Sequence, residues 1–284
     1  MRKLIFCALG LLVVNVYAQQ PDTVTTPKIW THSLVGGLNL TQVSFDNWAQ
    51  GGENALAYAL SMIGKSVCDR SKTNWETNYK FAFGQTRLGD QGLRKTDDKI
   101  DLETVLTYKL GTYINPYVAA TLKTQFAKGY DYGTKPRTSV SKFFDPGYLT
   151  QSVGFGYQPV TQIKTRLGAA LREVITSEFS EFKYADDPKT ASIEKTKVEG
   201  GLELVTEVNW QLQSNLLFTG KVELFDPIKN IDKVVVRSDN TLAAKVSKYV
   251  NVNLNVQFIK DPPVNRGKRQ IKETLGIGLS YSFL

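Results

Sequence analysis

The sequence predicts an all-β fold, a transmembrane antiparallel up-and-down β-barrel of about 12 strands with both termini periplasmic. Three observations lead to this prediction. Apolar and polar side chains alternate with period two along most of the chain, short and long connections alternate between these stretches, and tryptophans gather at one end of the expected strands. The clearest stretch is 271–283, whose apolar face opposes mainly glycine, serine and threonine. Such a small polar face suits the inside of a barrel whose outside meets lipid.

The chain begins with an export signal. Residues 1–18 combine a basic start, an apolar run too short to span a bilayer as a helix, and small residues before the expected cleavage site. We therefore expect a signal peptide over 1–18, a periplasmic leader over 19–29 and an outer-membrane barrel over 30–284. Cys68 is then the one cysteine of the exported sequence, which excludes an internal disulfide and a cysteine-based metal cluster.

The expected strands have roughly ten residues each, the length that a tilted membrane strand needs. In order they span 30–42, 54–63, 74–83, 100–110, 116–127, 148–158, 162–174, 196–210, 215–225, 235–247, 250–259 and 271–283. The strand at 250–259 alternates cleanly, with valine, leucine and phenylalanine on one face and asparagine and glutamine on the other. Gly154 and Gly156 blur the two faces of the strand at 148–158, which has the weakest pattern.

The connections carry an independent signal from residue 100 onward. Short connections at 111–115, 159–161, 211–214 and 248–249 alternate with longer ones at 128–147, 176–195, 226–234 and 260–270. Barrels of the outer membrane have short periplasmic turns and longer external loops. A soluble β protein would explain the alternation of side chains but would leave this pattern of connections a coincidence.

Aromatic residues give a third indication. Five of them fall on the apolar face and at the expected periplasmic end: Trp30, Trp75, Tyr108, Trp210 and Phe283. Amphipathic rings favour the headgroup level of a membrane, so this clustering predicts a periplasmic aromatic belt.

The residues do not indicate an enzyme. His32 is the only histidine, and it falls on the outward face of the first strand, so a Ser-His or Asp-His hydrolase site is not expected. The paired acids Asp97–Asp98 and Asp186–Asp187 lie near expected outer loops, where such pairs are usually solvated. We expect no catalytic residues, no metal and no cofactor.

The inward faces are rich in charge, with more bases than acids. Lys164, Arg166 and Arg172 on one expected strand face the acids of the next strand, which are Glu199, Glu203 and Glu207. These six are expected to line the lumen. They could form a polar constriction that selects solutes by charge, or a filling of cross-strand ion pairs that closes the lumen. Twelve strands lie between full small barrels and open porins, so size leaves both interpretations open.

The outer loops are basic, as at Arg94, Lys128 and Arg137. Phosphates of lipopolysaccharide are the nearest anions for such a rim, although a merely solvated rim explains the charge equally well. The other expected partners are outer-membrane lipid, the barrel-assembly machinery during insertion and an envelope protein, with no nucleic acid. Trp48 lies outside the belt in a loop with Gly51 and Gly52, where it could plug the lumen or contact a partner.

The motif Asn47-Trp48-x-x-Gly51-Gly52, with the segments 95–99 and 145–147, resembles an uncharacterised Bacteroidetes family, domain-of-unknown-function family 3078. The resemblance extends over nearly all of the exported sequence. It implies a barrel in the cell outer membrane and no particular activity.

Together these features lead us to expect a monomeric, porin-like barrel that forms a narrow channel for small polar or anionic solutes. The alternative is a non-conducting structural or accessory barrel of an envelope assembly, which docks through its outer loops.

Overall fold

The structure is a computed structural model that describes residues 29–45, 52–134, 136–179, 184–187, 190–229, 233–262 and 268–283. The predicted signal peptide, the leader up to residue 28, Trp48 and Gly51 lie outside these residues. No helix within the described ranges is long and apolar enough to cross a membrane.

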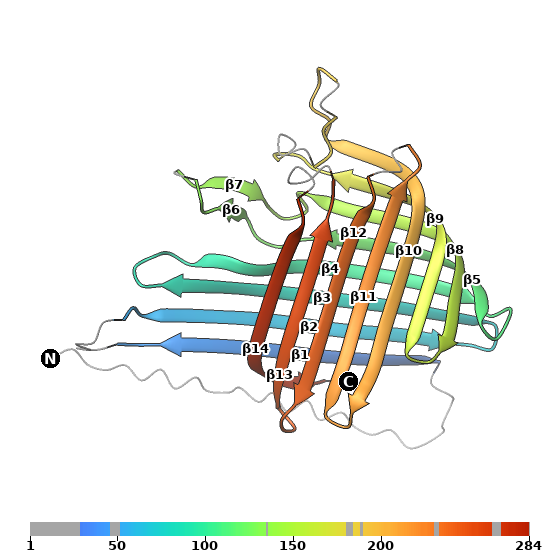
Figure 1. Cartoon of the computed structure of the whole chain (residues 1–284), viewed down its shortest axis with the longest axis horizontal. Coiled ribbons are helices and arrows are strands. Elements are labelled where there is room, and N and C mark those ends of the chain that lie inside the picture. Colours follow the sequence, from blue (N-terminus) through green and yellow to red (C-terminus); the bar gives the residue numbers. More distant parts are fainter. Residues whose placement is uncertain are drawn as a thin grey trace.

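Twelve antiparallel strands close into one barrel, as the sequence predicts (Figure 1). Neighbours in the chain are neighbours in the ring, except that β8 pairs with β5 because β6 and β7 form a separate hairpin between them. The strands are β1 (Trp30–Val43), β2 (Ala55–Asp69), β3 (Thr73–Leu88), β4 (Arg94–Tyr108), β5 (Ile114–Thr124), β6 (Gly129–Asp131), β7 (Thr138–Ser141), β8 (Gly147–Val160), β9 (Ile163–Ile175), β10 (Thr196–Gln213), β11 (Leu216–Pro227), β12 (Val235–Lys245), β13 (Val250–Lys260) and β14 (Gln270–Ser282).

Several strands are longer than their alternation predicts. β2 continues to Asp69 and β4 begins at Arg94, so both extend beyond the expected ranges towards the barrel ends. The β6–β7 hairpin lies inside the connection expected at 128–147. Its strands are too short to show a period of two, which is why the sequence did not indicate them.

Apolar side chains cover the outside of the barrel and charged ones occupy its inside. Leu275 and Ile277 are 71% and 70% exposed, whereas Glu103 and Arg172 are 4% and 5% exposed. A water-soluble protein has the opposite distribution, because a buried charge costs free energy and a large exposed apolar surface attracts partners. The arrangement is that of a barrel whose outer surface contacts lipid.

The two ends of the barrel differ. The short-turn end carries the connections 70–72, 109–113, 161–162, 214–215 and 246–249, and the long-loop end carries 44–54, 89–93, 125–146, 176–195, 228–234 and 261–269. The five aromatic residues of the predicted belt lie at the short-turn end with exposed side chains, and the rings of Trp30 and Trp75 are 5.7 Å apart. In Figure 1 the β6–β7 hairpin stands away from the barrel wall.

Glycines on the inward face of β8 and β9 make room for one aromatic ring. Gly154 and Gly168 pair across these strands, and Gly154 also stands opposite Tyr117 of β5. A Cβ atom on Gly168 would lie 2.7 Å from the Tyr117 hydroxyl and 2.4 Å from the backbone oxygen of Val153. The glycines that blurred the predicted strand therefore allow the strands to approach closely and the tyrosine to fill the lumen beside them.

Closure of the ring depends on a short seam. β1 and β14 pair only from Val35 to Asn39, opposite Ser282 to Gly278. The Asn39 side chain packs against the glycines of β14, since a Cβ atom on Gly278 would lie 1.7 Å from its amide oxygen.

Candidate functional site

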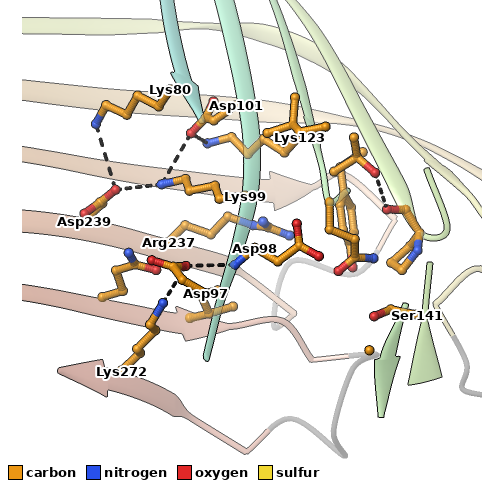
Figure 2. A pocket seen from close by; sticks show the side chains of 18 of the residues that line it. Lys80, Asp97, Asp98, Lys99, Asp101, Lys123, Ser141, Arg237, Asp239 and Lys272 are labelled. Carbon is orange, nitrogen blue, oxygen red and sulfur yellow. Dashed lines mark hydrogen bonds and ion pairs between the residues drawn. The ribbon is translucent and has the colours of Figure 1, made fainter. Parts of the chain in front are cut away.

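Ion pairs join opposite walls of the lumen. Lys99 of β4 donates to Asp239 of β12 over 2.7 Å, although these strands lie on opposite sides of the ring (Figure 2). Lys80 lies 3.9 Å from the same carboxylate oxygen, and Lys99 lies 3.7 Å from Asp101. At this level the lumen is therefore crossed by side chains and is not a wide pore.

A second group of charges surrounds Glu103 of β4. Its carboxylate accepts from Arg166 of β9, and from Lys221 of β11 over 2.6 Å. Lys221 also lies 3.1 Å from Glu223, which accepts from Lys123 over 2.5 Å. The Glu103 side chain is only 3% exposed, so its charge is stable inside the barrel because two cations contact it.

A third group lies nearer the short-turn end. Glu76 of β3 is shared by Lys164 of β9 and Lys65 of β2, at 3.1 Å and 2.5 Å. The side chains of the two lysines remain 46% and 42% exposed. This bridge is therefore more accessible to water than the one at Glu103.

Two cavities lie on either side of the Lys99–Asp239 level. One, of about 480 Å³, is at the long-loop end, where Gly129, Tyr130 and Tyr132 line it. The other, of about 430 Å³, reaches the short-turn end, where Thr161 and Gln162 of the β8–β9 turn line it. Both are also lined by the same four charged residues, which are Lys80, Asp101, Lys221 and Asp239. These side chains therefore lie between the two cavities; we call these four residues and Lys99 the constriction layer.

The long-loop cavity has a basic excess. Its lining includes seven basic and five acidic side chains. Figure 2 shows ion pairs of three of these acids. Lys272 of β14 contacts Asp97, and Lys99 lies between Asp101 and Asp239. The lining of this cavity therefore carries two more basic than acidic side chains.

The pairing expected among the six residues predicted to line the lumen is found only in part. Glu199 stands opposite Arg172 and Glu207 opposite Lys164, as the alternation suggests. Glu203 stands opposite Gly168, and Arg166 opposite Val205. The closest acids to Lys164 and Arg166 are Glu76 and Glu103, which come from the other wall. Lys164, Arg166 and Glu207 also line a third cavity, of about 330 Å³, at the short-turn end.

The sequence did not indicate Asp261, the main partner of Arg172. This residue follows β13 in a connection at the long-loop end, yet it is only 2% exposed. Its carboxylate accepts from Arg172 over 2.5 Å and lies 3.6 Å from Arg237, whose guanidinium stacks on the Tyr148 ring. No periodic pattern marks an isolated loop acid, so only the three-dimensional structure reveals this contact.

Asp98 of β4 and Asp145 of the β5–β8 connection bind residues of the long connections. The carboxylate of Asp98 accepts from Lys95 and from the backbone of Phe126 and Ala127, so this acid is not simply solvated. Asp145 is 2% exposed and accepts from Thr176 over 2.6 Å and from Ser177 and Glu178. It thereby ties the β5–β8 connection to the β9–β10 connection.

The hydrogen bonds to Asp145 have an electrostatic consequence. Burial alone would raise the pKa of this carboxyl. The bonds from Thr176, Glu178 and Ser177 outweigh burial, and the pKa falls below its ordinary value of 3.8. The ionised form of Asp145 is therefore the one that fits between the two loops.

His32 is part of a hydrogen-bonded group on the outward face at the short-turn end. Its Nδ1 atom lies 2.8 Å from the Ser66 hydroxyl oxygen, which lies 3.1 Å from the Tyr79 hydroxyl. The imidazole stacks on Trp30 with the rings nearly parallel. From the sequence we expected only that His32 lies on the outward face, because the pairing of β1 with β2, which places Ser66 beside it, is not visible in one strand. These bonds satisfy polar groups on an outward surface.

Of the predicted loop site at Trp48, Gly51 and Gly52, the structure describes only Gly52. Its φ of +139° is one that residues with a side chain rarely adopt. A Cβ atom here would lie 2.4 Å from the Phe45 ring. The glycine therefore allows the close approach of Phe45, and whether Trp48 plugs the lumen stays a prediction.

Comparison of the sequence with protein families gives two matches. Residues 40–130 match a family described as a protein of unknown function, DUF3078, and residues 147–283 match a second one described as a protein of unknown function, DUF481. Similarity to the first family is thus limited to part of the barrel, rather than extending over nearly all of the exported sequence. No curated protein matches the chain.

Solved structures that resemble this one are outer-membrane barrels. An outer-membrane channel from Pseudomonas putida F1 is 12% identical, with a TM-score of 0.40 over 93% of this chain and 99% of that chain. The NanC porin is 11% identical, with a TM-score of 0.38 over 88% and 98% of the two chains. The translocator domain of autotransporter NalP from Neisseria meningitidis is 10% identical, with a TM-score of 0.36 over 89% and 87%. None of these similarities transfers a residue role to this chain, which is similar to two families of unknown function.

Proposed function

We propose that this protein is an outer-membrane barrel that forms a narrow channel for small polar or anionic solutes. The observation that carries the proposal is the constriction layer between the two cavities, because both share Lys80, Asp101, Lys221 and Asp239. Lysine side chains are long and flexible, so small rearrangements of this layer would connect the cavities. The apolar outside and the charged inside support a position across the membrane.

The basic lining at the long-loop end supports a preference for anions. A ring of charged side chains selects permeating ions by sign. Lys80 and Lys272 are suited to this role, since both line the long-loop cavity and their side chains are 40% and 37% exposed. These lysines contact carboxylates in the structure. An anionic solute that passes would take the place of those carboxylates.

Liposome swelling with the refolded protein tests this function. Small organic anions should enter faster than neutral sugars of equal size, and organic cations should enter more slowly. Neutralising both lysines, as in K80Q/K272Q, should reduce the advantage of anions, whereas K248Q at the short-turn end should leave it unchanged. Equal rates for all three solute classes through a swelling-active barrel would contradict anion preference.

The alternative is a non-conducting barrel closed by the same ion pairs. Buried contacts such as Glu103 with Arg166 and Lys221 favour this interpretation, because a solute would have to replace them. It predicts no swelling with any solute from protein that is correctly inserted and folded.

A further inference from the structure

One group of basic residues has no acidic partner among the described residues. Arg94, Lys128 and Arg137 are exposed at the long-loop end, and no described carboxylate lies within ion-pair distance of them. The lumen is different, since Lys99, Lys123 and Lys221 each contact acids. The charges of Arg94, Lys128 and Arg137 are thus not neutralised by a described acid, unlike those of these three lysines in the lumen.

The three bases gather over two tyrosine rings of the β6–β7 hairpin. Arg94 at the start of β4 and Arg137 just before β7 approach the ring of Tyr132, with guanidinium carbons 5.0 Å and 6.0 Å from its centre. The Lys128 ammonium lies 6.0 Å from the ring centre of Tyr130. We call these five residues the hairpin platform.

Hydrogen bonds and packing around Tyr132 fix part of the platform in position. The Tyr132 hydroxyl accepts from the backbone N–H of Lys95, which fixes the ring against β4. The Lys95 side chain donates to the backbone oxygen of Ala127 and packs on Gly129, where a Cβ atom would lie 3.0 Å from its Nζ. The Oδ1 atom of Asp131, the acid of this hairpin, accepts a hydrogen bond from the backbone N–H of Gly133. The Tyr132 ring is therefore held in place while the bases remain accessible.

The position of the platform relates it to the lumen. Tyr130 and Tyr132 line the long-loop cavity, and the bases lie on these rings. An anion bound to the platform would lie at the mouth of the cavity that has the basic excess.

We infer that the hairpin platform is a binding site for phosphate groups at the entrance of the barrel. Two planar guanidinium groups beside one ring can each offer a fork of N–H donors to a tetrahedral phosphate, and a lysine adds a third charge. The phosphate could belong to a small phosphorylated solute on its way into the lumen or to a glycolipid of the surrounding membrane. That the solute then passes through rests on the proposed channel function, whereas binding at the platform does not.

Titration calorimetry of the refolded full-length exported protein with inorganic phosphate tests the site. The variant R94Q/R137Q should bind phosphate at least about tenfold more weakly, because charge-assisted hydrogen bonds are lost. R94K/R137K should also lose affinity, since lysine keeps the charge but not the fork. K248Q is the matched control, because Lys248 stacks on Tyr249 at the other end of the barrel. Unchanged affinity in R94Q/R137Q, or no phosphate binding by the wild type, would overturn the inference.

Two further experiments distinguish the source of the phosphate. If soluble solutes are the ligands, inorganic phosphate should reduce current through the bilayer-inserted barrel from the long-loop side only. If the glycolipid is the ligand, lipopolysaccharide should co-purify with the wild type and be lost from R94Q/R137Q. In a barrel that conducts, absence of both effects would overturn the site. A barrel that binds phosphate but never conducts would refute the channel and leave the platform standing.

Discussion

Lys99 on β4 and Asp239 on β12 connect opposite sides of the barrel, with Nζ and Oδ2 only 2.7 Å apart. The same carboxylate accepts from the side-chain amide of Asn255 over 2.7 Å. A lumen crossed in this way admits a solute only when the charged side chains move. Among the described residues, the side chains that cross the lumen at this level narrow it.

Removing both charges of this contact should widen the constriction. We expect K99Q/D239N to increase single-channel conductance, because neutral amides attract each other less strongly across the lumen. E173Q is the control, since Glu173 lies on the outward face of β9 and, among the described residues, accepts from the neighbouring Gln151. Equal conductance in all three proteins would mean that the constriction lies elsewhere.

Asp261 should hold the β13–β14 connection inside the barrel. In D261A the buried Arg172 loses its closest partner, and breaking such a pair costs about 3 kcal/mol or more. We expect the connection to detach and trypsin to cleave faster at Lys268 and Arg269. D90A, which changes an exposed acid of another connection, should keep the wild-type digestion rate.

Acidification should separate the two connections that Asp145 joins. Its folded pKa lies below 3.8, so its contribution to stability is complete above that value and is lost as pH falls through the lowered folded pKa. Amide hydrogen exchange at Ser177 and Glu178, which donate to this carboxylate, should therefore accelerate only below pH 3.8, after correction for intrinsic rates. In D145N this additional acid step should be missing. Persistent protection at low pH in the wild type would show that other contacts hold the loops.

Gly154 should tolerate no side chain. A Cβ atom there would lie 2.1 Å from the backbone oxygen of Leu167, so G154A must push β8 and β9 apart. Overpacking of this kind costs about 1–3 kcal/mol, which urea unfolding of the barrel would measure. G200A in β10 is the matched control, because nothing lies within 4 Å of the added atom. Similar losses in both variants would point to a general sensitivity to strand substitution.

The sequence predicted the barrel because its signals are local. Alternation such as that at 271–283 shows which side chains share a face, and the connection lengths show which ends share a side. It could not predict partners across the lumen: Lys164 and Glu76 are 88 residues apart, and they meet only because the strands close into a ring. The same limit applies to Ser66 beside His32 and to Asp261 beside Arg172. Contacts of this kind depend on strand register and on loop positions, which the alternation of one strand does not encode.

The most direct test of the channel is single-channel recording of the refolded protein in a planar bilayer under a salt gradient. We predict steady, small openings with a reversal potential that shows a weak preference for anions. No current from protein whose heat-modifiable band shows a folded barrel would contradict the channel, and the cross-lumen ion pairs would then be the structure that closes it.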